Sequence, residues 1–163
     1  MKRRTQVLIM TALLVLTAVL APMSAYAARS TVQILKVTVD GARLRSGPSS
    51  EHSILTSLDE GSKVFYLDKQ KDSFCYVCTS YGAKGYVFRD YLASYGAAYK
   101  DQIYYARSKA KVYKKASSGS SRVTTLGKGQ HVIVYQVKGN WAYIKTLGGK
   151  GGYVRKSSLS KAG

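Results

Sequence analysis

The sequence predicts an all-β protein made of two small domains in tandem. The first reason is an internal duplication, because the Gly-Tyr-Val triplet that begins at Gly85 recurs at Gly152, 67 residues later. The second is composition, since Val, Ile, Tyr and Thr are frequent and Gly and Ser interrupt the chain at short intervals, as in β-structure. No stretch after residue 30 has a long apolar face at helical period.

The surroundings of the triplet are duplicated with it. Residues 74–77 (Phe-Cys-Tyr-Val) return as residues 141–144 (Trp-Ala-Tyr-Ile), and Leu92 returns as Leu159. Upstream the shift is 68 residues, and it pairs Leu44 with Val112, Leu58 with Leu126, Gly61 with Gly129 and Val64 with Val132. The period exceeds that of solenoid repeats, so we expect each copy to be a domain of its own.

Residues 1–27 have the pattern of a secretory signal peptide. A basic start (residues 2–4) precedes an apolar run over residues 7–20 and the small-x-small cleavage site of residues 25–27. The apolar run is shorter than the roughly 18 residues of a membrane span, although an uncleaved anchor is the alternative. We therefore expect an exported protein, secreted or associated with the cell wall, with no membrane span after cleavage.

Each predicted element of the first copy follows from local sequence. Residues 33–39 alternate as a strand does, and Leu44 lies in a second strand that Gly47-Pro48 ends, because proline cannot donate to a ladder. The remaining predicted elements are a turn at 59–62, a strand at 64–67, a hairpin tip at 69–73, a strand at 74–79, a turn at 81–84 and a strand at 85–87. Short strands at this spacing indicate a small barrel or sandwich.

The first copy resembles a bacterial Src-homology-3-like (SH3b) domain. The similar elements are Leu44-Arg45-Ser46-Gly47-Pro48-Ser49, the Leu58-x-x-Gly61-x-x-Val64 spacing, Gly85-Tyr86-Val87 and Tyr91-Leu92. The family usually has Asn near Arg43 and prefers Trp where this chain has Phe74. The resemblance implies a five-stranded β-barrel with a short helical turn near residues 88–90, and it implies binding of cell-wall material or modulation of an attached hydrolase.

The second copy resembles the same family more weakly. It keeps the Leu126-x-x-Gly129-x-x-Val132 spacing, Trp141, Ile144, Gly152-Tyr153-Val154 and Leu159, but residues 112–113 and 117–121 replace the Arg-Ser-Gly-Pro element. Ser158 stands in the place of Tyr91. We therefore expect SH3-like domains at residues 34–92 and 104–160, joined by a short linker at 93–103 across which the barrels touch.

Charge divides the two copies. Residues 28–101 contain ten basic and eight acidic residues, a net charge of +2, whereas residues 102–163 contain thirteen basic residues and no acid, a net charge of +13. Such asymmetry is typical of polyanion binding, although a solubility surface is the alternative. We expect the second copy to bind through charge and the first through shape.

Catalysis is not expected, and we predict no cofactor and no metal. Cys75 and Cys78 form a C-x-x-C pair inside a predicted strand rather than at a helix start, where a redox pair is activated. Residues three apart in a strand lie about 10 Å apart and face opposite sides, so we expect no disulfide bond between the two cysteines. We expect the Cys75 side chain to point into the core and that of Cys78 to point outward. His52 and His131 have no nucleophile or acid at a recognisable spacing.

The candidate ligand-binding residues are aromatic in both copies and basic mainly in the second. They are Arg45, Phe74, Tyr76, Tyr91, Lys111, Lys114, Lys115, Trp141, Tyr143, Arg155 and Lys156. An aromatic ring offers a flat apolar face to sugar or peptide, although a core position is the alternative. The predicted partners are peptidoglycan or an anionic cell-wall polymer. The alternative is another exported protein, for which the chain would be an adaptor, and we expect no dedicated nucleic-acid site.

Overall fold

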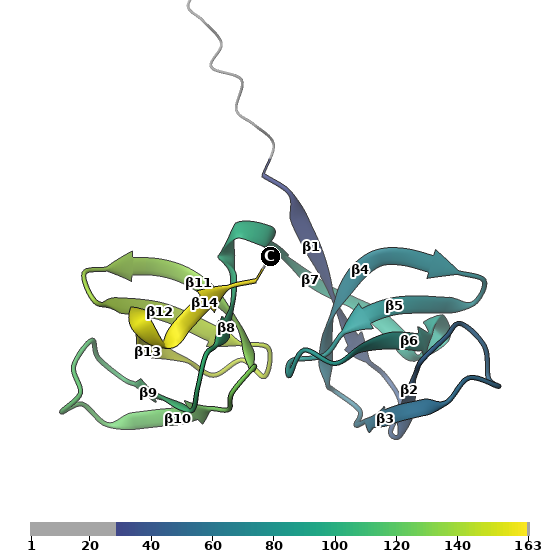
Figure 1. Cartoon of the computed structure of the whole chain (residues 1–163), viewed down its shortest axis with the longest axis horizontal. Coiled ribbons are helices and arrows are strands. Elements are labelled where there is room, and N and C mark those ends of the chain that lie inside the picture. Colours follow the sequence, from purple (N-terminus) through teal and green to yellow (C-terminus); the bar gives the residue numbers. More distant parts are fainter. Residues whose placement is uncertain (1–28, 163) are drawn as a thin grey trace, which may run out of the picture.

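The protein is all-β, as the sequence predicts, and consists of two similar lobes (Figure 1). The computed structural model describes residues 29–162, except for the side chains of residues 68–70, so the predicted signal peptide lies outside the described residues. Each lobe is an antiparallel sheet of seven strands. We call strands β1–β7 the first domain and β8–β14 the second domain.

The strands of the two domains are short and closely spaced. In the first domain they are β1 (Thr31–Val37), β2 (Ala42–Arg45), β3 (Ile54–Leu58), β4 (Lys63–Lys71), β5 (Phe74–Cys78), β6 (Lys84–Phe88) and β7 (Leu92–Tyr99), with the 3-10 turn η1 (Arg89–Tyr91) before β7. A second 3-10 turn, η2 (Lys100–Gln102), leads to the second domain. There the strands are β8 (Ile103–Ala106), β9 (Ala110–Tyr113), β10 (Arg122–Leu126), β11 (His131–Lys138), β12 (Trp141–Thr146), β13 (Gly151–Arg155) and β14 (Leu159–Lys161), with η3 (Lys156–Ser158) before β14.

The duplication predicted from the sequence is confirmed by the topology. The strand orders are β3-β2-β6-β5-β4-β1-β7 and β10-β9-β13-β12-β11-β8-β14, which are the same order shifted by seven strands. The expected closed barrel of five strands is wrong, because two further strands join each sheet: β3 pairs with β2 and β7 with β1 in the first domain, and β10 pairs with β9 and β14 with β8 in the second. The strand order of the first sheet ends at β3 and β7 and does not close into a barrel. The expected helical turn is confirmed as η1.

Each domain has its own apolar core on one face of its sheet. Leu44, Val64, Val77 and Val87 are essentially inaccessible in the first domain. The equivalent core of the second domain includes Val112, Leu126, Val132, Ile144 and Val154, all inaccessible. The period of two along the strands produces these cores, since alternate side chains point to the same face.

Two glycines let neighbouring strands approach closely, as their place in the repeated triplet suggests. A Cβ at Gly85 would lie 2.5 Å from the carbonyl oxygen of Arg45. A Cβ at Gly152 would lie 2.6 Å from the carbonyl oxygen of Tyr113 and 2.7 Å from Cγ1 of Val112. Only glycine fits both places without moving the adjacent strand.

The two domains pack against each other through a third apolar cluster, which we call the interdomain core. It joins Ile34, Phe65, Cys78 and Ala98 of the first domain to Ile103, Ile133 and Leu147 of the second. Residues 93–103, which we expected as a linker, mostly continue the first sheet: β7 pairs along β1 from Val37↔Leu92 to Thr31↔Tyr99. The expectation that the domains touch is therefore confirmed.

The interdomain core changes the environment of one cysteine. Cys75 is buried in the core of the first domain, as expected. Cys78 lies on the opposite face, but the expectation that it is exposed is wrong, since only 4% of its surface is accessible. The second domain covers that face, which the strand pattern of the first domain alone cannot show. Both thiols are free.

Candidate binding grooves

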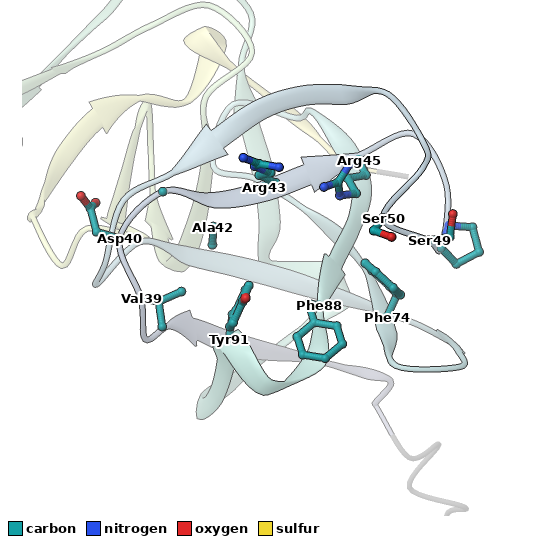
Figure 2. Close-up of a pocket in the computed structure, with 12 residues that line it drawn as sticks. Val39, Asp40, Ala42, Arg43, Arg45, Ser49, Ser50, Phe74, Phe88 and Tyr91 are labelled. Atoms are coloured by element: carbon teal, nitrogen blue, oxygen red, sulfur yellow. The ribbon is translucent and has the colours of Figure 1, made fainter.

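The first domain has a groove of about 710 Å³ beside its β2–β3 loop, and we call it the first groove (Figure 2). Its lining combines aromatic and charged side chains of β2, β5, β6 and η1. The residues are Val39, Asp40, Gly41, Ala42, Arg43, Arg45, Pro48, Ser49, Ser50, Phe74, Phe88 and Tyr91.

Three rings form the aromatic side of the first groove. Phe74 and Phe88 are partners across β5 and β6, with ring centroids 5.5 Å apart in an edge-to-face arrangement. Phe88 contacts Tyr91 in the same way at 5.2 Å. Edge-to-face packing stabilises such pairs beyond simple burial, so the three rings support one another while Tyr91 stays 39% exposed.

The opposite side of the first groove is polar and is held by its own loop. Arg45 donates from Nη1 to the carbonyl oxygen of His52 at 2.8 Å. Nδ1 of His52 and Oγ of Ser49 are hydrogen-bonded at 2.8 Å. The His52 ring lies directly over Gly47, leaving no room for a Cβ there. This contact accounts for the glycine of the Gly-Pro element, and Asp40 adds a negative charge to the lining.

The second domain has a smaller groove of about 430 Å³, which we call the second groove. It carries cations and no acid. Its lining residues are Lys114, Lys115, Ala116, Gln136, Lys138, Trp141, Tyr143 and Tyr153. Backbone bonds from Lys114 to Ser121, at 2.9 Å, and from Lys115 to Oγ of Ser120, at 3.0 Å, order the loop that carries the lysines.

Trp141 lies at the centre of this basic region. Its ring contacts Tyr113 edge-to-face at 5.8 Å. The guanidinium of Arg155 lies 4.4 Å from the centre of the Trp141 ring, within the range of a cation–π contact. Arg155 occupies the place that Phe88 has in the first domain, because each pairs with the aromatic residue that begins the preceding strand.

The structure brings most of the candidate residues to these grooves. Arg45, Phe74 and Tyr91 line the first groove. Lys114, Lys115, Trp141 and Tyr143 line the second, and Arg155 contacts its tryptophan. Tyr76, Lys111 and Lys156 line neither groove. The Tyr76 ring instead packs on Tyr86 at 4.9 Å.

Sequence reasoning missed several lining residues. They are Asp40, Arg43 and Phe88 in the first groove and Gln136, Lys138 and Tyr153 in the second. Phe88 and Tyr153 could have been predicted from the sequence. Antiparallel pairing of β5 with β6 places Phe88 opposite Phe74, and the equivalent pairing of β12 with β13 places Tyr153 opposite Tyr143. Of the others, Asp40 lies on a turn and Arg43 in β2, whereas Gln136 and Lys138 lie on β11 beyond the bulge in its pairing with β12.

The cysteines are not activated by their surroundings. Burial raises the pKa of the Cys75 thiol, although Arg89 opposes the shift. Burial likewise raises the pKa of the Cys78 thiol, against the opposing charge of Lys84. The thiolate is the reactive form, so both cysteines behave as small apolar residues of the cores.

Two aromatic grooves on small β-domains define a class of binding module. The family model described as "Bacterial SH3 domain" matches residues 40–93 and 108–160. The chain belongs to that family, and its two copies are bacterial SH3 domains in tandem. Domains of this family are binding modules that are often extracellular or associated with the cell wall. Within residues 29–162, no helix is long and apolar enough to cross a membrane.

The solved structures that match this chain are only distantly similar to it. NlpC1 and NlpC2 from Trichomonas vaginalis are 17% and 14% identical, and matches to them cover 85% and 82% of this chain and 49% of each of those chains, both with a TM-score of 0.35. An NlpC/P60 family protein from Bacillus cereus is 12% identical, with 80% of this chain and 56% of that chain covered and a TM-score of 0.34. The chain thus spans about half the length of these proteins. A search of curated proteins found no match.

Proposed function

We propose that this protein is a non-catalytic, exported module that binds the cell envelope through both domains. The observation that carries the proposal is that each domain has an aromatic groove beside the loop after its second strand, with cations at its edge. Family membership supports it, because bacterial SH3 domains are binding modules.

The two grooves suit different wall ligands. The lining of the first groove carries one acidic side chain, Asp40, and two basic ones, Arg43 and Arg45, beside its aromatic wall, so it suits a peptide that carries both charges, such as the stem peptides of peptidoglycan. The second groove has only cations, Lys114, Lys115 and Lys138, around its rings. It suits an anionic wall polymer, such as a teichoic acid, because opposite charge attracts at a range set by salt.

Sedimentation with purified, protein-free cell walls tests the proposal. We expect the mature protein, starting at Ala28, to sediment with the walls. Walls stripped of anionic polymer should still bind it, but less tightly and with weaker dependence on salt. A protein that stays in the supernatant at all salt concentrations would instead be an adaptor for another exported protein.

A further inference from the structure

A third concavity, of about 670 Å³, lies between the domains, and we call it the interdomain cleft. Its lining is rich in hydroxyl side chains and includes one exposed aromatic ring, that of Tyr81. The residues are Thr56, Ser57, Leu58, Asp59, Gly61, Ser62, Lys63, Val64, Thr79, Ser80, Tyr81, Ala83, Thr124, Thr125, Gln130, Thr146, Leu147, Gly148 and Lys150. None of them lines either groove.

The cleft is built from equivalent pieces of both domains. Thr56 of β3 and Thr124 of β10 are related by the 68-residue repeat, and both line it. The turns that begin at Thr79 and Thr146 are also equivalent: each threonine Oγ1 accepts from the backbone N–H four residues later at 3.1 Å. Neither domain forms the cleft alone, so it is a property of the tandem.

Tyr81 is held in place although most of its surface is exposed. Its accessible fraction is 65%. A Cβ at Gly127 of the second domain would lie 3.4 Å from Cε1 of Tyr81, so the ring rests against that glycine. The preceding carbonyl, of Ser80, accepts from the backbone N–H of His131 at 2.7 Å. These contacts orient the ring before any ligand arrives, which lowers the cost of binding.

The hydroxyl groups around Tyr81 are free to bind. Within the described residues, no side-chain hydrogen bond involves the hydroxyls of Ser57, Ser62, Ser80, Thr124 and Thr125. Each hydroxyl can donate one hydrogen bond and accept others. The charges of the lining do not favour an ion: it includes both an acid, Asp59, and a base, Lys150, and the ammonium of Lys63 is engaged 4.5 Å over the ring of Tyr95.

We propose that the interdomain cleft binds an uncharged oligosaccharide. The apolar face of a sugar stacks on Tyr81, and its hydroxyls exchange hydrogen bonds with the serine and threonine side chains of both domains. The volume falls within the range of about 300–1,000 Å³ typical of small-molecule sites. The inference rests on the proposed function, to which it adds glycan chains as a ligand class separate from those of the two grooves.

Calorimetric titration of the mature protein with chitotetraose, a peptide-free and uncharged glycan, tests this site. We expect saturable binding that Tyr81→Ala weakens about five- to tenfold, corresponding to the contribution of one aromatic contact. Tyr81→Phe should stay within about twofold of the wild type, since it keeps the ring. Thr124→Val with Thr125→Val should also weaken binding by about tenfold, through two lost hydrogen bonds.

The matched control is Tyr135→Ala. Tyr135 is 52% exposed and lies outside the cleft, so its loss should leave the affinity for chitotetraose unchanged. Wild-type protein that sediments with walls but shows no saturable titration would overturn the glycan site and leave the proposed function standing. Titration that Tyr81→Ala and Tyr135→Ala affect equally would place the sugar elsewhere. Failure of both titration and sedimentation would overturn both proposals.

Discussion

The two domains share a framework and differ at the groove. Phe74, Phe88 and Tyr91 form an aromatic wall in the first domain. The same places in the second domain hold Trp141, Arg155 and Ser158, so one ring is replaced by a cation and another by a small hydroxyl side chain. The position of the groove differs accordingly. The first groove lies between Phe74 and Tyr91 of η1, whereas the second lies beside Trp141, next to Tyr143 and Tyr153. The two copies therefore have similar residues at their buried positions and different residues at the exposed positions of the groove.

If the two domains share one framework, substitution of Gly85 and of Gly152, the glycines in close contact with a neighbouring strand, should destabilise the protein equally. We expect Gly85→Leu and Gly152→Leu each to lower the free energy of unfolding by about 3 kcal/mol, because the side chain must displace the adjacent strand. Chemical denaturation measures the loss. Gly96→Leu is the control, since no atom lies within 4 Å of a Cβ there. A loss at only one of the two crowded sites would show that the frameworks have diverged.

The interdomain core should couple the two domains. Ile133 is 6% exposed and packs in that core, so Ile133→Ala is expected to cost about 2–3 kcal/mol. Calorimetry should show one transition for the wild type and a broader or split transition for the variant. Val137→Ala, at a 46% exposed site of the same strand, should change stability by less than about 0.5 kcal/mol. Two separate wild-type transitions would contradict the coupling.

The division of labour between the grooves predicts different salt responses. We expect Lys114→Ala with Lys115→Ala to weaken wall binding by about tenfold near 50 mM salt and to have little effect near 500 mM, where the screening length falls to a few Å. Phe74→Ala should weaken binding by a similar factor at both salt concentrations. Lys161→Ala, an exposed lysine outside both grooves, is the control. Equal salt dependence in all variants would mean that the charge serves solubility only.

The smallest expected effect is a pH dependence that belongs to the second domain. His131 stands where the first domain has Lys63, and its ring lies between Phe65 and Tyr105. Burial lowers the pKa of His131; hydrogen bonds to the backbone of Gly129 and Ser80 oppose the shift in part, and the nearby charge of Lys84 adds to it. The unfolded chain therefore binds a proton more readily than the folded one, so stability should fall as the pH drops below about 6.5.

Denaturation of the wild type and of His131→Phe between neutral and mildly acidic pH measures that effect. The variant should lose less stability over this range, since it has no imidazole to protonate. His52→Phe is not a useful control, because His52 holds the loop of the first groove. Identical slopes for wild type and His131→Phe would assign the acid sensitivity to other groups.

The sequence predicted what depends on repetition and periodicity. The recurrence of Leu44, Val64 and Gly85 in the second copy, at shifts of 68, 68 and 67 residues, located the cores and the close strand contact, because buried positions tolerate few alternatives. It could not predict the environment of Cys78, since the cover comes from the second domain. Phe88 could be found only by pairing the two predicted strands in register, which places it opposite Phe74. The interdomain cleft could not be predicted, because it depends on the orientation of the domains, which leaves no local signal in the chain.

The packing of the domains also fixes where their binding loops lie. The loops after β2 and β9, which border the two grooves, occupy opposite ends of the molecule (Figure 1). A single molecule whose grooves are both occupied would therefore hold two separate polymer strands, as a cross-linker does, rather than two neighbouring units of one strand. The protein would then dissociate from a dense polymer network more slowly than a protein with either groove alone, because dissociation requires both grooves to be empty at the same time.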